Sequence, residues 1–95
     1  MATSSISSGV LSASAQVFTG KNRINALTVL TDGTNPATIE IYDNTDASGK
    51  KAVVGNCVGA NLTNHYIFEN PVLIETGIYV NITGAGATCI VFFGG

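Results

Sequence analysis

The feature that most constrains the fold of this chain is a series of short segments rich in β-branched and aromatic residues. From Gln16 onward these segments recur about every ten residues, and Gly, Asn, Asp or Pro residues separate them, which is the spacing of a β-sandwich or barrel. No stretch carries apolar residues at the spacings of three and four that an amphipathic helix requires. The sequence therefore predicts an all-β chain with almost no helix.

We expect a single antiparallel β-sandwich of jelly-roll-like form, built from about seven short strands. The strands are expected at residues 16–19, 23–31, 37–42, 51–58, 65–68, 77–82 and 88–93. Alternation within the third and sixth of these gives each strand one solvated face. The residues expected to point inward on these two strands are Ile39, Ile41, Ile78, Val80 and Ile82.

Two segments lack this alternation. Residues 26–30 and 90–93 are apolar on both faces, as expected for a central strand or for a strand that a second subunit covers. The C-terminal strand is therefore a candidate interface.

Turn residues lie between the expected strands at 32–36, 43–49 and 83–86, and we expect short antiparallel connections there. Gly84-Ala85-Gly86 also resembles the opening of a dinucleotide-binding fingerprint. A strand is expected after it where that fingerprint requires a helix, which favours a hairpin turn.

The N-terminal residues 1–15 are rich in Ser, Ala and Thr, and their only sizeable apolar residues are Ile6, Val10 and Leu11. We interpret this stretch as an arm that precedes one β-sandwich domain at residues 16–95. Two outcomes are open for the arm, namely disorder or pairing with a neighbouring subunit by edge-strand addition. No secretory signal is visible at residues 1–9, so we expect no export of the chain.

Composition points to assembly with other proteins. Charged residues make up 11% of the chain, less than half of the usual share of roughly 25%. The net charge is −2 without a basic stripe, so we expect no nucleic-acid partner. The longest apolar run, at residues 90–93, is far too short to cross a bilayer, so we expect no membrane partner.

No catalytic, cofactor or metal motif stands out. We interpret Cys57 and Cys89 as small buried hydrophobic residues in a reducing compartment. His65 has no accompanying motif, so a surface or interface histidine is favoured over a Cys–His nucleophile. The loop at 43–49 gathers oxygen ligands but lacks the spacing of an EF-hand, which favours a solvated turn over a weak calcium site.

The segments at residues 26–44, which end in Ile41-Tyr42-Asp43-Asn44, and at residues 77–87, which run from Gly77-Ile78-Tyr79-Val80 to Gly84-Ala85-Gly86-Ala87, resemble small virion proteins of tailed bacteriophages. The resemblance covers most of residues 22–94. It implies a β-sandwich in the virion, assembled in the host cytoplasm as a homotrimer. Such a protein decorates or cements the capsid by bridging major capsid protein subunits, and the resemblance provides no catalytic residues to transfer.

Three functional hypotheses follow. The first is a capsid decoration (cement) protein, and the alternative is a tail or fibre β-module that binds a host glycan or another tail protein through exposed tyrosines and the 43–49 loop. The third, a small enzyme, would need an exposed and acidic cysteine close to His65. For the first two hypotheses the candidate interface residues are Ile6, Val10, Leu11, Val17, Phe18, Tyr42, Tyr79, Phe92 and Phe93.

Overall fold

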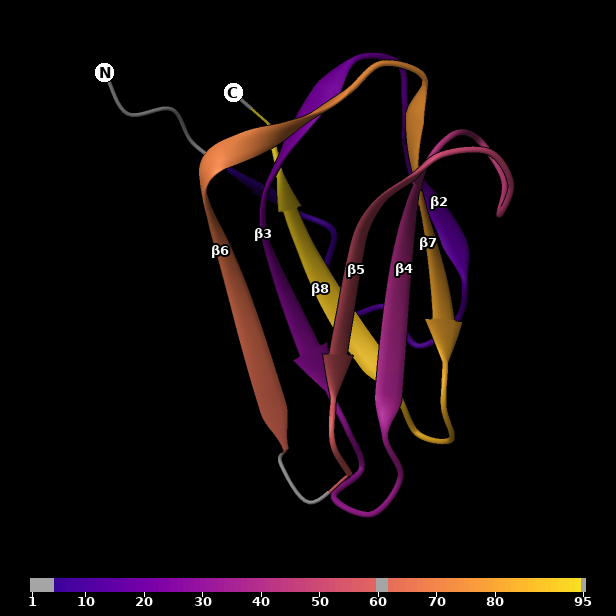
Figure 1. The fold of residues 1–95 in the computed structure, drawn as a ribbon, viewed down its shortest axis with the longest axis vertical. Helices are drawn as coiled ribbons and strands as arrows, with labels where there is room; N and C mark the ends of the chain where they lie inside the picture. The colour runs from indigo at the N-terminus through magenta and orange to yellow at the C-terminus, as the bar shows by residue number, and fades with distance from the viewer. Residues whose placement is uncertain (1–4, 60–61, 95) are drawn as a thin grey trace.

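A computed structural model describes residues 5–59 and 62–94, which form two four-stranded antiparallel sheets without a helix in these ranges (Figure 1). The all-β prediction is confirmed. Eight strands are present where seven were expected, because a short strand also forms near the N-terminus. The strands are β1 Ile6–Ser7, β2 Ala15–Thr19, β3 Asn22–Leu30, β4 Ala37–Asp43, β5 Lys51–Cys57, β6 Thr63–Ile74, β7 Gly77–Thr83 and β8 Thr88–Phe93.

The strand order is that of a jelly roll. One sheet has the order β1-β8-β3-β6 and the other β2-β7-β4-β5. The chain thus crosses between the sheets at every connection except the β4–β5 hairpin, as in an eight-stranded jelly roll. The prediction of a jelly-roll-like sandwich is confirmed.

The connection at residues 84–86 was expected to be a hairpin turn, and that prediction is wrong. It joins β7 to β8, which lie in different sheets. Gly84 has a φ of +122°, and a Cβ there would lie 2.2 Å from the Pro36 carbonyl oxygen, so only glycine fits this connection. Turn residues mark where a strand ends, but they do not indicate whether the next strand pairs with it or crosses to the other sheet.

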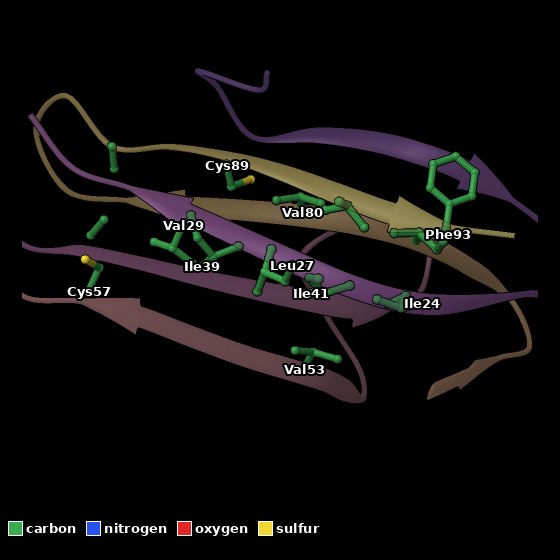
Figure 2. Close-up of a cluster of buried hydrophobic side chains, with 14 of the residues drawn as sticks. Ile24, Leu27, Val29, Ile39, Ile41, Val53, Cys57, Val80, Cys89 and Phe93 are labelled. Atoms are coloured by element: carbon green, nitrogen blue, oxygen red, sulfur yellow. The ribbon is translucent and has the colours of Figure 1, made fainter. Parts of the chain in front are cut away.

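The core lies between the two sheets and consists of their inward-facing side chains (Figure 2). Ile39, Ile41, Ile78 and Val80 are fully buried, and Ile82 is half-buried against them, as the alternation predicts. Leu27 of β3 crosses the interlayer space toward Gly55 of β5. A Cβ on Gly55 would lie 2.8 Å from a Leu27 methyl carbon, so the glycine makes room for the leucine.

Strand β3 is central in its sheet, between β8 and β6. This position explains its apolar character only in part. Leu27 and Val29 point inward and are fully buried, while Ala26, Thr28 and Leu30 face outward and stay partly exposed. The outward residues of this strand therefore remain available for a contact outside the chain.

Strand β6 is longer than predicted because it continues past Pro71 to Ile74. It is an edge strand, where a proline is tolerated since its missing N–H costs no hydrogen bond. The register jumps opposite Asn25, from Ile67 to Val72, so residues 68–71 form a bulge. The strand prediction for 65–68 stopped at this bulge.

The N-terminal segment lies on the chain's own sheet. Ile6 pairs with Phe93, the Ser8 N–H donates to the Val91 carbonyl at 2.9 Å, and Leu11 bridges to Cys89. Residues 1–4 of the expected arm lie outside the described residues. Exchange of the arm between subunits stays a prediction.

Substitution Leu27→Ala should test the interlayer packing. Because this side chain is fully buried, its loss should lower the free energy of unfolding by about 2–5 kcal/mol, measured by urea denaturation. The matched control is Leu73→Ala, since Leu73 is 63% exposed and should change stability by less than about 0.5 kcal/mol. Equal losses in the two variants would contradict the assigned core.

Candidate interaction surface

The outer face of the β1-β8-β3-β6 sheet is the main candidate site. Nine residues of β6, β3 and β8 form three cross-strand rows on it, and we call this set the apolar face. The rows are Ile67–Ala26–Phe92, His65–Thr28–Ile90 and Thr63–Leu30–Thr88. The set contains no Asp, Glu, Lys or Arg, and all nine side chains are partly or fully exposed.

Two of the four polar residues of the apolar face bond to each other. Thr28 Oγ1 and His65 Nδ1 share a hydrogen bond of 2.6 Å, and the direction of donation depends on the histidine tautomer. The His65 ring meets the Phe92 ring edge-on, with centroids 6.3 Å apart and planes at 77°. His65 is therefore an ordered part of this surface, in agreement with its interpretation as a surface or interface histidine.

A shallow depression lies at one end of the apolar face. Its lining residues are Ser5, Asn25, Ala26, His65, Ile67 and Phe92. The Asn25 side-chain amide donates to Ser5 Oγ at 2.8 Å and to the Gly94 carbonyl at 3.1 Å. Because this rim amide already has partners within the chain, covering the depression would leave it bonded.

The outer face of the opposite sheet carries a polar network, with the exposed Val54 beside it. Ser14 Oγ donates to Asn81 Oδ1 at 3.1 Å, Asn81 Nδ2 donates to Glu40 Oε1 at 3.1 Å, and Lys51 Nζ lies 2.7 Å from Glu40 Oε2. The hydrogen bond and charge of Lys51, with the Asn81 amide, hold the pKa of Glu40 below its usual range. This network suits a solvated face.

The three tyrosines do not share one exposed platform. Tyr42 and Tyr79 pair across strands on the polar face, as alternation predicts, but Tyr42 is only 9% exposed, with Lys51 Nζ 6.0 Å from its ring centroid. The Tyr66 hydroxyl is used inside the chain, where it donates to the Asn56 carbonyl at 2.8 Å and accepts from the Asn56 N–H at 3.0 Å. Tyr66 therefore ties β6 to β5.

The other predicted interface residues divide into core and surface. Phe93 is buried, with its ring centroid 5.9 Å from that of Phe18, while Val17 and Leu11 pack against the core. These four have little surface to offer a partner. Three of the predicted residues are available: Ile6 and Val10 are 56% and 67% exposed, and Phe92 lies on the apolar face.

Phe92 is the one residue of the apolar face that was also among the predicted interface residues. His65 was interpreted separately as a surface or interface histidine, and the strand predicted at 65–68 contains both His65 and Ile67. Ala26, Leu30 and Ile90 lie in the two segments that are apolar on both faces. That pattern indicated the C-terminal strand as an interface, but it did not indicate that the strand at 26–30 lies beside it.

The structure does not bring a cysteine to His65. Cys89 pairs in register with Val29 and is buried on the inward side of the sheet whose outward side carries His65. Burial raises the pKa of the Cys89 thiol to about 11, which suppresses its thiolate. Cys57 is buried on the opposite sheet, and no disulfide joins the two cysteines (Figure 2).

The 43–49 loop uses its leading carboxylate internally. Asp43 Oδ1 accepts from the Thr76 N–H at 2.8 Å and, with Oδ2, from the Glu75 N–H at 3.1 Å. Ser48 Oγ donates to Asp46 Oδ1. Within residues 5–59 and 62–94, no three His, Cys, Asp or Glu residues are grouped to hold a metal ion. The loop is thus a capped turn.

Comparison of the chain with protein-family models, with curated proteins and with solved structures finds no match. The part of the chain that the structure describes contains no helix able to span a membrane. The two outer faces of the sandwich are therefore the surfaces on which a partner could be bound.

Asp43 should make stability depend on acid. Burial raises the pKa of this carboxyl. The N–H groups of Thr76, Glu75 and Gly77 and the charge of Lys50 together lower the pKa by more than burial raises it, so the pKa of Asp43 lies below its usual range. The stabilisation is present above the unfolded-state pKa of about 3.9 and is lost as pH falls through the lower folded-state pKa.

Asp43→Asn should lower the free energy of unfolding by about 1–2 kcal/mol at pH 7, because charge-assisted hydrogen bonds weaken. The difference from the unmodified chain should shrink below about pH 4, measured by urea denaturation across pH. Asp46→Asn is the control, because Asp46 accepts a hydrogen bond from the Ser48 hydroxyl within the turn, whereas Asp43 accepts from backbone N–H groups of residues 75 and 76. A pH-independent difference for Asp43→Asn would contradict the assignment.

Proposed function

We propose that this chain is a non-enzymatic structural protein of a bacteriophage virion that decorates the capsid and bridges major capsid protein subunits. The observation that carries the proposal is the face of nine uncharged residues on the outside of the β1-β8-β3-β6 sheet, on which Ile67 is 75% exposed. A face without charged side chains, with an exposed isoleucine beside a partly exposed phenylalanine, suits contact with another protein. Its mechanism is contact, without chemistry.

One such contact is weak, so the proposed role requires many copies of the chain on each capsid. Burial of apolar surface contributes roughly 25 cal/mol per Å² removed from water, so one small face contributes a few kcal/mol after the cost of association. On a capsid, several weak contacts per assembly add up through effective concentration. A sparsely charged surface, with 11% charged residues in the chain, keeps the desolvation cost low.

The virion assignment draws on two supports. The segments at residues 26–44 and 77–87 resemble small phage virion proteins, and the jelly roll is a fold that viral capsid proteins use. Lectins and cupins use the fold as well, so the fold supports the role without specifying it. The homotrimer and the virion location belong to this same proposal.

The glycan-binding alternative has less support from the site. It depends on exposed tyrosines and on the 43–49 loop, whereas Tyr42 lies under Lys51, Tyr66 holds the Asn56 backbone, and Asp43 caps residues 75–77. The apolar face lies on the opposite sheet from Tyr42 and Tyr79. A protein contact explains that face, and a glycan platform does not.

The proposal predicts that particles lacking the chain release DNA at a lower temperature than complete particles. Adding back the unmodified chain should restore the release temperature, measured by a DNA-binding dye during heating. Ile67→Lys should restore it less, because it places a charge on the apolar face. Val54→Lys is the matched control on the polar face, where the new ammonium would lie beside Glu40.

Two results would count against the proposal. Complete and deficient particles could release DNA at the same temperature, which would remove the cementing role. Alternatively, the Ile67→Lys chain could stabilise particles as well as the unmodified chain, which would remove the apolar face from the contact.

A further inference from the structure

A hollow of about 380 Å³, which we call the basic hollow, lies where β3 begins and β6 ends (Figure 1). Its lining residues are Lys21, Asn22, Arg23, Leu73, Ile74 and Glu75. Arg23 pairs across strands with Leu73, which is 63% exposed. Because the next residue, Ile24, is fully buried, Arg23 points outward, on the same side of the sheet as the apolar face. The basic hollow therefore lies at one end of the proposed contact surface.

Backbone hydrogen bonds hold the walls of the basic hollow in place. The Gly20 N–H donates to the Thr76 carbonyl at 2.8 Å, which joins the β2–β3 turn to the β6–β7 turn. The Gly94 N–H donates to the Arg23 carbonyl at 2.9 Å. The backbone beside Lys21 and Arg23 is thus fixed, while both of their side chains are exposed.

The basic hollow gathers two of the chain's four basic residues. Lys51, on the other sheet, pairs with Glu40 at 2.7 Å. Neither Lys21 nor Arg23 forms an ion pair with any carboxylate in residues 5–59 and 62–94. Their two positive charges and the one negative charge of Glu75 give the lining a net charge of +1, on a chain whose net charge is −2. A single monovalent anion would neutralise this lining.

From this charge balance we infer that the basic hollow binds one carboxylate, the side chain of an Asp or Glu residue of the protein that the apolar face contacts. The planar guanidinium of Arg23 can donate to both oxygens of a carboxylate, and Lys21 adds a second positive charge. The exposed Leu73 provides an apolar wall for the methylene groups of the partner's side chain. The inference rests on the proposed function, because the carboxylate belongs to the partner named there.

A nucleic-acid backbone suits the basic hollow less well than a carboxylate does. Such a backbone presents a row of phosphates, and affinity for it grows with the number of cations that contact it. The apolar face beside the hollow contains no Lys or Arg that could contact a second phosphate. The site therefore fits one isolated anionic group.

Nuclear magnetic resonance titration of the purified chain tests the site without particles. The probe is the amide of N-acetylglutamate, added in the millimolar range because an exposed ion pair binds weakly. The corresponding glutamine compound, at equal ionic strength, is the neutral control. The glutamate probe should shift the backbone amide signals of residues 21–23 and 73–75 saturably, and the glutamine probe should leave them unchanged.

Charge substitutions locate the binding. Lys21→Gln and Arg23→Gln should each weaken binding of the glutamate probe about two- to fivefold, and Glu75→Gln should strengthen it by a similar factor because it removes a repulsion. Lys50→Gln is the matched control, since it removes the same charge from a residue outside the lining. Circular dichroism of each variant verifies that the fold is retained.

The inference is overturned if the glutamate probe causes no saturable shift, or if Arg23→Gln and Lys50→Gln bind it equally well. Tighter binding of dimethyl phosphate than of the glutamate probe would replace the carboxylate with a phosphate group. Failure here is distinguishable from failure of the proposed function, because particle heating is scored separately. Probe binding without an effect on particles would remove the capsid role alone, and particle stabilisation without probe binding would remove the carboxylate site alone.

Discussion

The structure depends on the packing of one sheet's inward side chains against those of the other. Leu27 and Val29 of β3 face Ile39 and Ile41 of β4 across the interlayer space, and all four are fully buried (Figure 2). A chain of 95 residues can form one hydrophobic core of modest size, so burial of these side chains between the sheets is its main source of stability. Gly55 contributes by leaving space for Leu27 where the sheets approach.

This packing also determines which side chains lie on the outer faces of the two sheets. Side chains alternate along a strand, so placing Leu27 and Val29 inward directs Ala26, Thr28 and Leu30 outward. On β4 the same rule directs outward Glu40, which joins a polar network with Lys51. The two sheets therefore share one core but present different surfaces, one without charged side chains in its three cross-strand rows and one with a network of polar and charged side chains. This asymmetry is the basis of the proposed contact function.

Sequence reasoning could reach the fold class because the relevant signals are local. Alternation found the inward residues of β4 and β7, and the absence of helical spacing excluded helices. The strand order was not local information: the 84–86 turn looks the same whether its strands pair or cross. Strand β1 was missed because two residues, Ile6 and Ser7, carry too little pattern. The two segments that are apolar on both faces indicated part of the apolar face. The β6 residues of this face could not be predicted, because they depend on the register in which β6 pairs with β3, and the sequence does not contain that register.

The central claim is that the apolar face is the surface on which this protein assembles. The most direct measurement is a cryo-EM difference map between particles made with and without the chain, at a resolution that orients the jelly roll. The account predicts density on the capsid in which the outer face of the β1-β8-β3-β6 sheet is covered by another protein chain. Density on the tail, or a capsid density with that face open to solvent and the β2-β7-β4-β5 sheet in contact, would contradict it.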